Sequence, residues 1–285
     1  MKEFISKGGR RKRSSLSTIV KSRNKYLKEI RQLRKTIPNW DNFFAEENDE
    51  DSAAGWVRLD VLGGPLCKKY AWAIPNQRAL NIIANFSPVV EIGAGKGYWA
   101  SLLLEMGVDI ECYDKKGNKK GNWTEVKVGG PKVLAEKGMS KKTLFLCYPD
   151  DSNNMAVKCL DHFSGEYIIH VGELITTGTL SGGEQAPFGR TTGSDFSVAL
   201  AESFHCLLTA SIPRFPFSKD CITVWKRTQF APGKSVVLAE NHSEDNDNDN
   251  GNDNGDEEED CWASIPPEEV LPEDRAAPCL AHLLH

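Results

Sequence analysis

The stretch VVEIGAGKGYW, residues 89–99, decides the fold of this chain. Residues 89–92 form a short apolar run typical of a buried strand, and Tyr98 begins an apolar segment typical of a helix. The chain must turn sharply between them. Glycines at 93, 95 and 97 permit that turn and leave backbone N–H groups open to a ligand, because side chains would block its approach. The stretch therefore predicts a strand, a ligand-binding loop and a helix in succession.

The spacing of the glycines narrows the choice of ligand. A dinucleotide-binding loop has the pattern G-x-G-x-x-G, and a P-loop ends in G-K-[ST], whereas here the pattern is G-x-G-x-G and Lys96 is followed by Gly97. Asp114 ends the next predicted strand, where a carboxylate can accept hydrogen bonds from both ribose hydroxyls. The pattern predicts a cofactor that contains a nucleoside. The alternative is an ordinary strand–helix turn in a domain without a nucleotide.

Strands and helices alternate around this loop between residues 56 and 229. The predicted strands are 88–92, 109–114, 124–128, 143–147, 167–171, 205–211 and 221–226. The predicted helices are 76–86, 98–106, 131–137, 154–163 and 195–203. Such alternation is typical of an α/β fold with a doubly wound, mostly parallel sheet. We expect a seven-stranded, Rossmann-like sheet whose last two strands form an antiparallel edge hairpin.

The glycine loop resembles the first motif of the class I S-adenosylmethionine-dependent methyltransferases, (hydrophobic)-(D/E)-x-G-x-G-x-G. The motif is matched by Glu91, Gly93, Gly95 and Gly97, and Asp114 matches the ribose-binding acid of the family. The resemblance covers about residues 70–228. It implies that the chain is a methyltransferase and that these five residues bind S-adenosylmethionine. The stretch from Tyr70 to Trp99 is also similar to a little-characterised group of methyltransferase-like proteins, which fixes no substrate.

The fourth predicted strand departs from the family. Amino-directed relatives end it in [D/N]-P-P-[F/Y/W], whereas this chain has Cys147, Tyr148, Pro149 and Asp150. The departure argues against methylation of a base or amide nitrogen. In one interpretation Tyr148 stacks on the acceptor and Asp150 or Asp151 acts as a base or an anchor, while Cys147 borders the cofactor. In the other, Pro149 and Asp150 only end the strand.

Glu173 follows the fifth predicted strand. The carboxyl ends of strands face the ligand crevice in sheets of this kind, so we expect Glu173 to line the acceptor side. A solvent-exposed glutamate is the alternative. The stretch 176–194 is rich in Gly, Ser and Thr, and it predicts a flexible loop over the pocket. The candidate catalytic residues are therefore Tyr148, Asp150 and Glu173.

The two ends of the chain carry opposite charges. Residues 1–35 hold 13 Lys and Arg and two acids, whereas residues 240–260 hold 11 acids and neither Lys nor Arg. We expect a basic extension over 1–55, with a helix at 16–35 and an acidic loop at 41–55, and a disordered acidic tail over 230–285. The basic start suits nuclear localisation or nucleic acid, an organellar transit peptide, or a solvated tail. Nucleic acid is thus a candidate partner.

Composition excludes several other classes of protein. The longest apolar runs fall far short of the ~20 residues of a membrane span, and no secretory signal is visible. Eight cysteines include no C-x-x-C pair, so we expect neither a metal site nor a disulfide scaffold. These features favour an intracellular enzyme, cytoplasmic or nuclear, with organellar import as an alternative. The alternative function is a non-catalytic methyltransferase-like module that binds RNA or protein.

Overall fold

The computed structural model describes residues 24–37, 40, 49–149, 154–174, 191–216, 218–228, 271 and 274–285, without the side chains of 49–56, 58 and 194. The predicted catalytic residue Asp150 lies outside these ranges. So do the basic segment 1–23, the acidic segment 240–260 and most of the expected loop over the pocket. The predictions made for those residues stay predictions.

Strands and helices alternate along the described chain. The strands are β1 (Val89–Ile92), β2 (Ile110–Asp114), β3 (Lys127–Val128), β4 (Thr143–Cys147), β5 (Tyr167–Gly172), β6 (Phe204–Ser211), β7 (Cys221–Arg227) and β8 (Arg275–Ala276). The α-helices are α2 (Lys25–Arg34), α3 (Asp49–Lys69), α4 (Gln77–Asn85), α5 (Tyr98–Glu105), α6 (Met155–His162) and α7 (Ser194–Ser203). Short 3₁₀ helices are η1 (Pro131–Ala135), η2 (Met139–Lys141) and η4 (Pro278–Leu283).

These strands form one sheet in the order β3-β2-β1-β4-β5-β7-β6-β8. Strands β1 to β5 pair in parallel, whereas β7 runs antiparallel between β5 and β6. The predicted α/β class and its mostly parallel sheet are therefore confirmed. Because Gly172 lies opposite Cys221, the start of β7 meets the carboxyl ends of the parallel strands at one edge. We call this edge the carboxyl edge.

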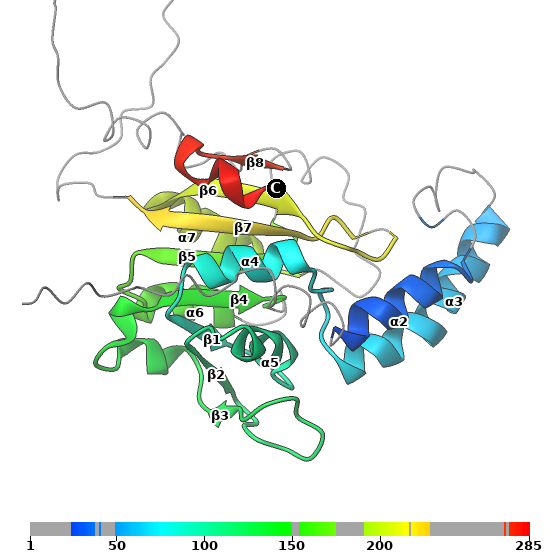
Figure 1. The fold of residues 1–285 in the computed structure, drawn as a ribbon, viewed down its shortest axis with the longest axis horizontal. Coiled ribbons are helices and arrows are strands. Elements are labelled where there is room, and N and C mark those ends of the chain that lie inside the picture. Colours follow the sequence, from blue (N-terminus) through cyan, green and yellow to red (C-terminus); the bar gives the residue numbers. More distant parts are fainter. Residues whose placement is uncertain are drawn as a thin grey trace, which may run out of the picture.

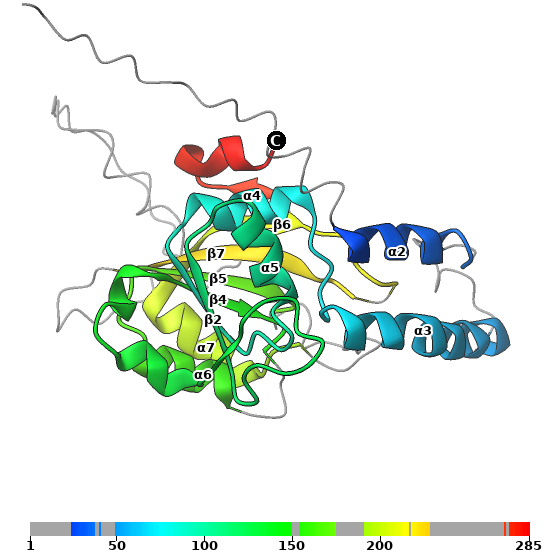
Figure 2. The ribbon, with the colours of Figure 1, turned by 60° about the horizontal axis from the view of Figure 1, so that its bottom comes forward.

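Helices cover both faces of the sheet. Helices α4 and α5 lie on one face, and α6 and α7 on the other (Figure 2). The core is divided accordingly, because strand side chains alternate between the two faces. Phe145 belongs to the cluster under α4 and α5, and its neighbour Leu144 belongs to the cluster under α6 and α7.

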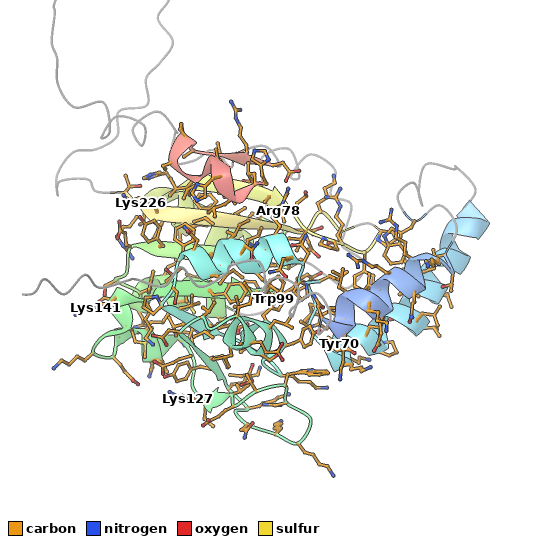
Figure 3. The ribbon with its side chains drawn as sticks, in the orientation of Figure 1. Tyr70, Arg78, Trp99, Lys127, Lys141 and Lys226 are labelled. Carbon is orange, nitrogen blue, oxygen red and sulfur yellow. The ribbon has the colours of Figure 1, made fainter. Side chains whose placement is uncertain are left out.

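The basic helix α2 belongs to the packed fold. Its apolar residues Tyr26, Ile30 and Leu33 recur at helical spacing and are buried. The ring of Tyr26 stacks on the ring of Tyr70 at a centroid distance of 4.9 Å. The backbone N–H of Tyr26 donates to the hydroxyl of Tyr98. Helices α2 and α3 lie together beyond the ends of the strands (Figure 1), and Tyr70 lies where α3 ends (Figure 3). They therefore lie beside the carboxyl edge.

The acidic loop predicted over 41–55 is wrong from Asp49 onward, because α3 begins there. Acidic residues at 49–51 occupy its first turn, where negative charge favours the N-terminus of a helix. The acidic run that predicted a polar loop is therefore partly the first turn of a helix. The predicted domain boundary between residues 55 and 56 falls inside this helix.

The disordered tail predicted over 230–285 is wrong for residues 274–285. Strand β8 pairs with β6 and adds an eighth strand to the seven expected, so the terminal hairpin is not the edge of the sheet. Asp274 accepts the N–H of Ser211 and pairs with Arg78 of α4. Leu280 of η4 is buried. A two-residue strand carries too short a pattern to be recognised from sequence.

Among the helices that the structure describes, none has both the length and the apolar character needed to cross a bilayer.

Candidate functional site

The glycine loop is fastened to the end of β2. The N–H groups of Gly93 and Ala94 both donate to the carbonyl of Tyr113, at 2.8 and 3.0 Å. Gly93, Gly95 and Gly97 have φ values of +81°, +57° and +71°. Residues other than glycine rarely adopt this left-handed backbone conformation, which explains the three glycines. The loop thus leads from β1 into α5 at the carboxyl edge.

Gly95 and Gly97 differ in what surrounds them. A Cβ on Gly97 would lie 2.8 Å from Cγ2 of Thr124, so packing against the β2–β3 connection also requires a glycine there. A Cβ on Gly95 would meet no atom within 4 Å. The loop is therefore open to a ligand at Gly95.

Asp114 stands beside this opening at the end of β2. Its Oδ2 accepts the N–H of Gly95 at 3.1 Å, and its Oδ1 accepts the N–H of Lys116 at 2.9 Å. These two bonds hold the carboxylate against the loop. Each carboxylate oxygen can accept a further hydrogen bond, so ribose hydroxyls can still donate to Asp114.

Glu91 lies behind the loop in β1 and is 2% exposed. Its Oε2 has no hydrogen-bond partner among the described residues. Burial, and then the charge of Asp114, raise the pKa of Glu91 to about 8. A buried carboxylate without a donor is costly, and such groups gather at functional sites.

Cys147 ends β4 at the same edge, and Tyr148 follows it. Burial, followed by the charges of Glu91 and Asp220, raises the pKa of the Cys147 thiol well above its usual value, so the thiol is not activated as a nucleophile. Tyr148 has a φ of +54°, which is rare for a residue other than glycine. Its ring stacks on Trp72 at a centroid distance of 6.0 Å.

Glu173 follows β5 and is only partly exposed. Its Oε1 accepts the N–H of Lys219, and burial raises its pKa. The hydroxyl of Thr191, at the end of the expected pocket loop, lies 2.6 Å from its backbone nitrogen. Glu173 therefore lies against the β6–β7 connection and is not a free surface glutamate.

Sequence reasoning missed Asp220. It directly precedes β7, it is 2% exposed, and burial raises its pKa to about 7. Its Oδ1 has no partner in the part of the chain that the structure describes. Asp220 stands in no motif, so only the antiparallel insertion of β7 shows that it reaches the carboxyl edge.

The structure thus brings every described candidate residue to one edge of the sheet. From β1, β2, β4 and β5 these are Glu91, Gly93, Gly95, Gly97, Asp114, Cys147, Tyr148 and Glu173. Of the two aromatics before α4, Tyr70 is buried, whereas Trp72 is 40% exposed. Within the described ranges no cluster of His, Cys, Asp and Glu could hold a metal ion.

A cavity of about 480 Å³ lies at the opposite edge of the sheet. Its lining includes Pro88, Thr143 and Tyr167, at or beside the amino ends of β1, β4 and β5. It is therefore separate from the glycine loop.

Strand β7 is antiparallel between β5 and β6, and the parallel part of the sheet is doubly wound as the sequence predicted. This is a Rossmann-like α/β fold. Gly129 follows β3 at a point where a side chain would not fit. A Cβ on Gly129 would lie 2.7 Å from the ring of Tyr113.

Two solved structures are similar to this chain. An O-methyltransferase family protein from Burkholderia thailandensis is 8% identical, with 71% of each chain covered and a TM-score of 0.34. CalO1, a methyltransferase in calicheamicin biosynthesis in its SAH-bound form, is 10% identical, with 75% of this chain and 72% of its own covered and a TM-score of 0.30. A scan of family models gives no match, and a search of curated proteins gives none. Neither structural similarity says what this chain binds.

Proposed function

We propose that this chain is an S-adenosylmethionine-dependent methyltransferase with its site at the carboxyl edge. The observation that carries the proposal is the opening at Gly95, with the Asp114 carboxylate beside it and the unpartnered Oε2 of Glu91 behind the loop. A nucleoside with ribose hydroxyls and an amino-acid ammonium group fits these three features. The hydroxyls would donate to Asp114 and the ammonium to Glu91, which would receive the donor that it lacks.

S-adenosylmethionine, when bound, supplies a methyl group on a positively charged sulfur. The protein has to orient this methyl group and the acceptor in line and exclude water, because proximity and orientation supply much of the rate in such transfers. Asp114 and the glycine loop would fix the nucleoside. Tyr148 and Trp72 would border the acceptor, and Tyr148 would be held by its N–H bond to the carbonyl of Val171, at 2.8 Å.

Transfer of a radiolabelled methyl group from S-adenosylmethionine to fractionated cell extract tests the proposal. We expect label in one acceptor fraction with the wild-type protein and a large loss with Tyr148→Ala, whose affinity for S-adenosylmethionine should change by less than about threefold. If the protein binds S-adenosylmethionine but labels no fraction, the non-catalytic alternative replaces the enzyme. If it does not bind, both assignments are wrong.

We also infer that nucleic acid is a partner, through the exposed face of α2 and the β2–β3 connection. Lys28 and Arg31 are exposed on α2, and Lys119 and Lys120 are exposed on the connection. The two segments are joined, because Trp123 lies 5.9 Å under the Lys25 ammonium and donates its indole N–H to the carbonyl of Lys69. Exposed basic side chains on neighbouring segments bind phosphate backbones.

Replacement of Lys28 and Arg31 by Glu should weaken binding of single-stranded RNA and lower its salt dependence, since each lost phosphate contact removes released counterions. The pair Lys132→Glu and Lys137→Glu, on and after η1, serves as the control. Equal RNA affinity in the α2 variant and in this control would contradict the assignment.

A further inference from the structure

Two acids at the carboxyl edge are strongly buried among the described residues, Glu91 and Asp220. The proposed cofactor contacts use Glu91 and leave Asp220 without a role. Its backbone N–H donates to the hydroxyl of Ser218 at 3.1 Å. Its carboxylate is almost fully buried, yet Oδ1 has no partner among the residues described. Buried carboxylates are normally held by donors. A ligand group that carries donors would satisfy this one.

The groups around Asp220 come from every element that meets at this corner. Its charge raises the pKa of Cys147 and Tyr148 at the end of β4. It also raises the pKa of Tyr26 in α2 and of Cys67 in α3. The remaining groups that act on Asp220 are Ser218 and Arg214 of the β6–β7 connection and Glu173 after β5. Asp220 therefore lies at the corner where the ends of β4 and β5 meet the helices α2 and α3.

The acids at this corner are more buried than the cations beside them. Glu173 and Asp220 are both acidic and both partly or fully buried, and the charge of Glu173 raises the pKa of Asp220. The charge of Arg214 acts on both carboxylates and that of Lys219 acts on Glu173, and both cations are exposed. Water screens exposed cations, so a positively charged guest next to the carboxylates would offset their buried negative charge, whereas a neutral hydroxyl group would not.

Aromatic side chains lie beside this corner. Trp72 is 40% exposed and stacks on Tyr148, with an angle of 20° between the ring planes. Tyr148 keeps its left-handed backbone at this point, a strain that folded proteins tolerate mainly at functional sites. An apolar or aromatic group attached to the guest would contact these rings, and cations are also attracted to such rings.

We propose that Asp220 and Glu173 form the acceptor pocket, that the acceptor is an aliphatic amine attached to an apolar or aromatic group, and that Asp220 is its base. This proposal rests on the proposed methyltransferase function. The amine enters as an ammonium ion and gives one proton to the Asp220 carboxylate. The nitrogen lone pair then forms the new N–C bond, while the C–S bond breaks and its electron pair goes to sulfur.

The assignment implies a dependence on pH. Burial and the neighbouring Glu173 raise the pKa of Asp220 to about 7, while Ser218 and Arg214 act in the opposite direction. Asp220 is therefore ionised, and able to bind an ammonium ion, only toward the upper side of neutral pH. Amine binding should strengthen as the pH rises from 6 to 8.

The test uses the full chain loaded with S-adenosylhomocysteine and two matched probes, 2-phenylethylamine and 2-phenylethanol. We expect saturable binding of the amine by calorimetry at millimolar concentration, at least tenfold stronger than that of the alcohol and stronger at pH 8 than at pH 6. Asp220→Asn should abolish the preference for the amine and its pH dependence. Asp161→Asn, in α6, is the control and should change neither.

The outcomes separate the two proposals. If S-adenosylhomocysteine itself does not bind to wild-type protein, the proposed function fails first. If it binds with unchanged affinity to wild-type protein and to Asp220→Asn, but the amine does not bind up to about 50 mM or binds no better than the alcohol, the pocket assignment is wrong. An Asp220→Asn variant that keeps the preference for the amine would also overturn it. Glu173→Gln gives a second reading, since it should weaken the amine at least threefold.

Discussion

Gly95 is the residue at which the loop is open to a ligand. An alanine there must adopt a left-handed backbone, which costs roughly 1–2 kcal/mol, and its Cβ would occupy the approach to the cofactor. We expect Gly95→Ala to weaken S-adenosylmethionine binding at least tenfold in calorimetry. Gly121→Ala is the matched control, because Gly121 also has a positive φ and open space around it. It should lose a comparable amount of stability and keep its affinity. Equal affinities of the two variants would make the glycine loop only a turn.

Asp114 contributes both to the loop and to the proposed ribose contact. Asp114→Ala removes charge-assisted hydrogen bonds, so we expect S-adenosylmethionine affinity to fall by about 2–3 kcal/mol. Asp109→Ala, just before the same strand at its opposite end, is the control and should leave affinity unchanged. An unchanged dissociation constant in Asp114→Ala would remove Asp114 from the site.

Individual residues of the site differ in how far sequence predicts them. Closely spaced glycines indicate positive φ values, so Gly93, Gly95 and Gly97 predict the loop on their own. Asp114 is predicted because it stands at the end of the next strand. Asp220 has no such signal, because a single Asp in a connection is usually solvated. Its burial arises only from the placement of β7 beside β5.

Among the elements, α2 combines a basic exposed face with a buried aromatic anchor. Tyr26 is fully buried and contacts Tyr70, Tyr98 and Cys67. Tyr26→Ala should therefore lower the free energy of unfolding by about 3–5 kcal/mol in urea titrations, the range for a large aromatic removed from a core. Lys28→Ala on the exposed face should change it by less than about 0.5 kcal/mol. A Tyr26→Ala variant as stable as Lys28→Ala would show that α2 is only an appended tail.

Elements with a strong pattern were predicted well. Strand β4 was predicted with its observed bounds, and α4, α5 and β7 were predicted to within a residue or two at each end. The strand predicted over 124–128 is only Lys127–Val128, and the helix predicted over 131–137 is the 3₁₀ helix Pro131–Ala135. The larger errors fall on α3, which starts in an acidic run, and on β8, which follows a low-complexity segment. In both places composition suggested a polar loop, and contacts with distant parts of the chain, such as Arg78 with Asp274, determine the structure.

For the whole molecule, two buried acids make stability depend on pH. The pKa values of Glu91 and Asp220 in the folded protein are about 8 and about 7, above the ordinary values of 4.5 and 3.8. Between these ordinary and raised pKa values the folded state holds protons that the unfolded chain has lost. Stability therefore falls as the pH rises from the ordinary to the raised pKa of each acid. Each group contributes a slope of up to about 1.4 kcal/mol per pH unit.

The slope can be measured by urea unfolding between pH 6.5 and 8. Buried His170, whose pKa is lowered from 6.5 to about 3, gives an opposite slope that is largest below pH 6.5 and fades above it as the histidine of the unfolded chain loses its proton. We expect the double variant Glu91→Gln, Asp220→Asn to flatten the decline and to be more stable than wild type at pH 8. Asp109→Asn should keep the wild-type slope. A wild-type slope in the double variant would mean that the two acids do not hold protons in the folded state.

The central claim is that the carboxyl edge binds S-adenosylmethionine. Isothermal titration calorimetry of the full wild-type chain with S-adenosylmethionine, S-adenosylhomocysteine, NAD and ATP tests it most directly. The account predicts one site per chain for the first two ligands, and at least a hundredfold weaker binding of NAD and ATP, because the G-x-G-x-G loop and its adjoining acid suit a nucleoside without phosphates. Absence of S-adenosylmethionine binding, or binding of NAD or ATP with equal affinity, would contradict it.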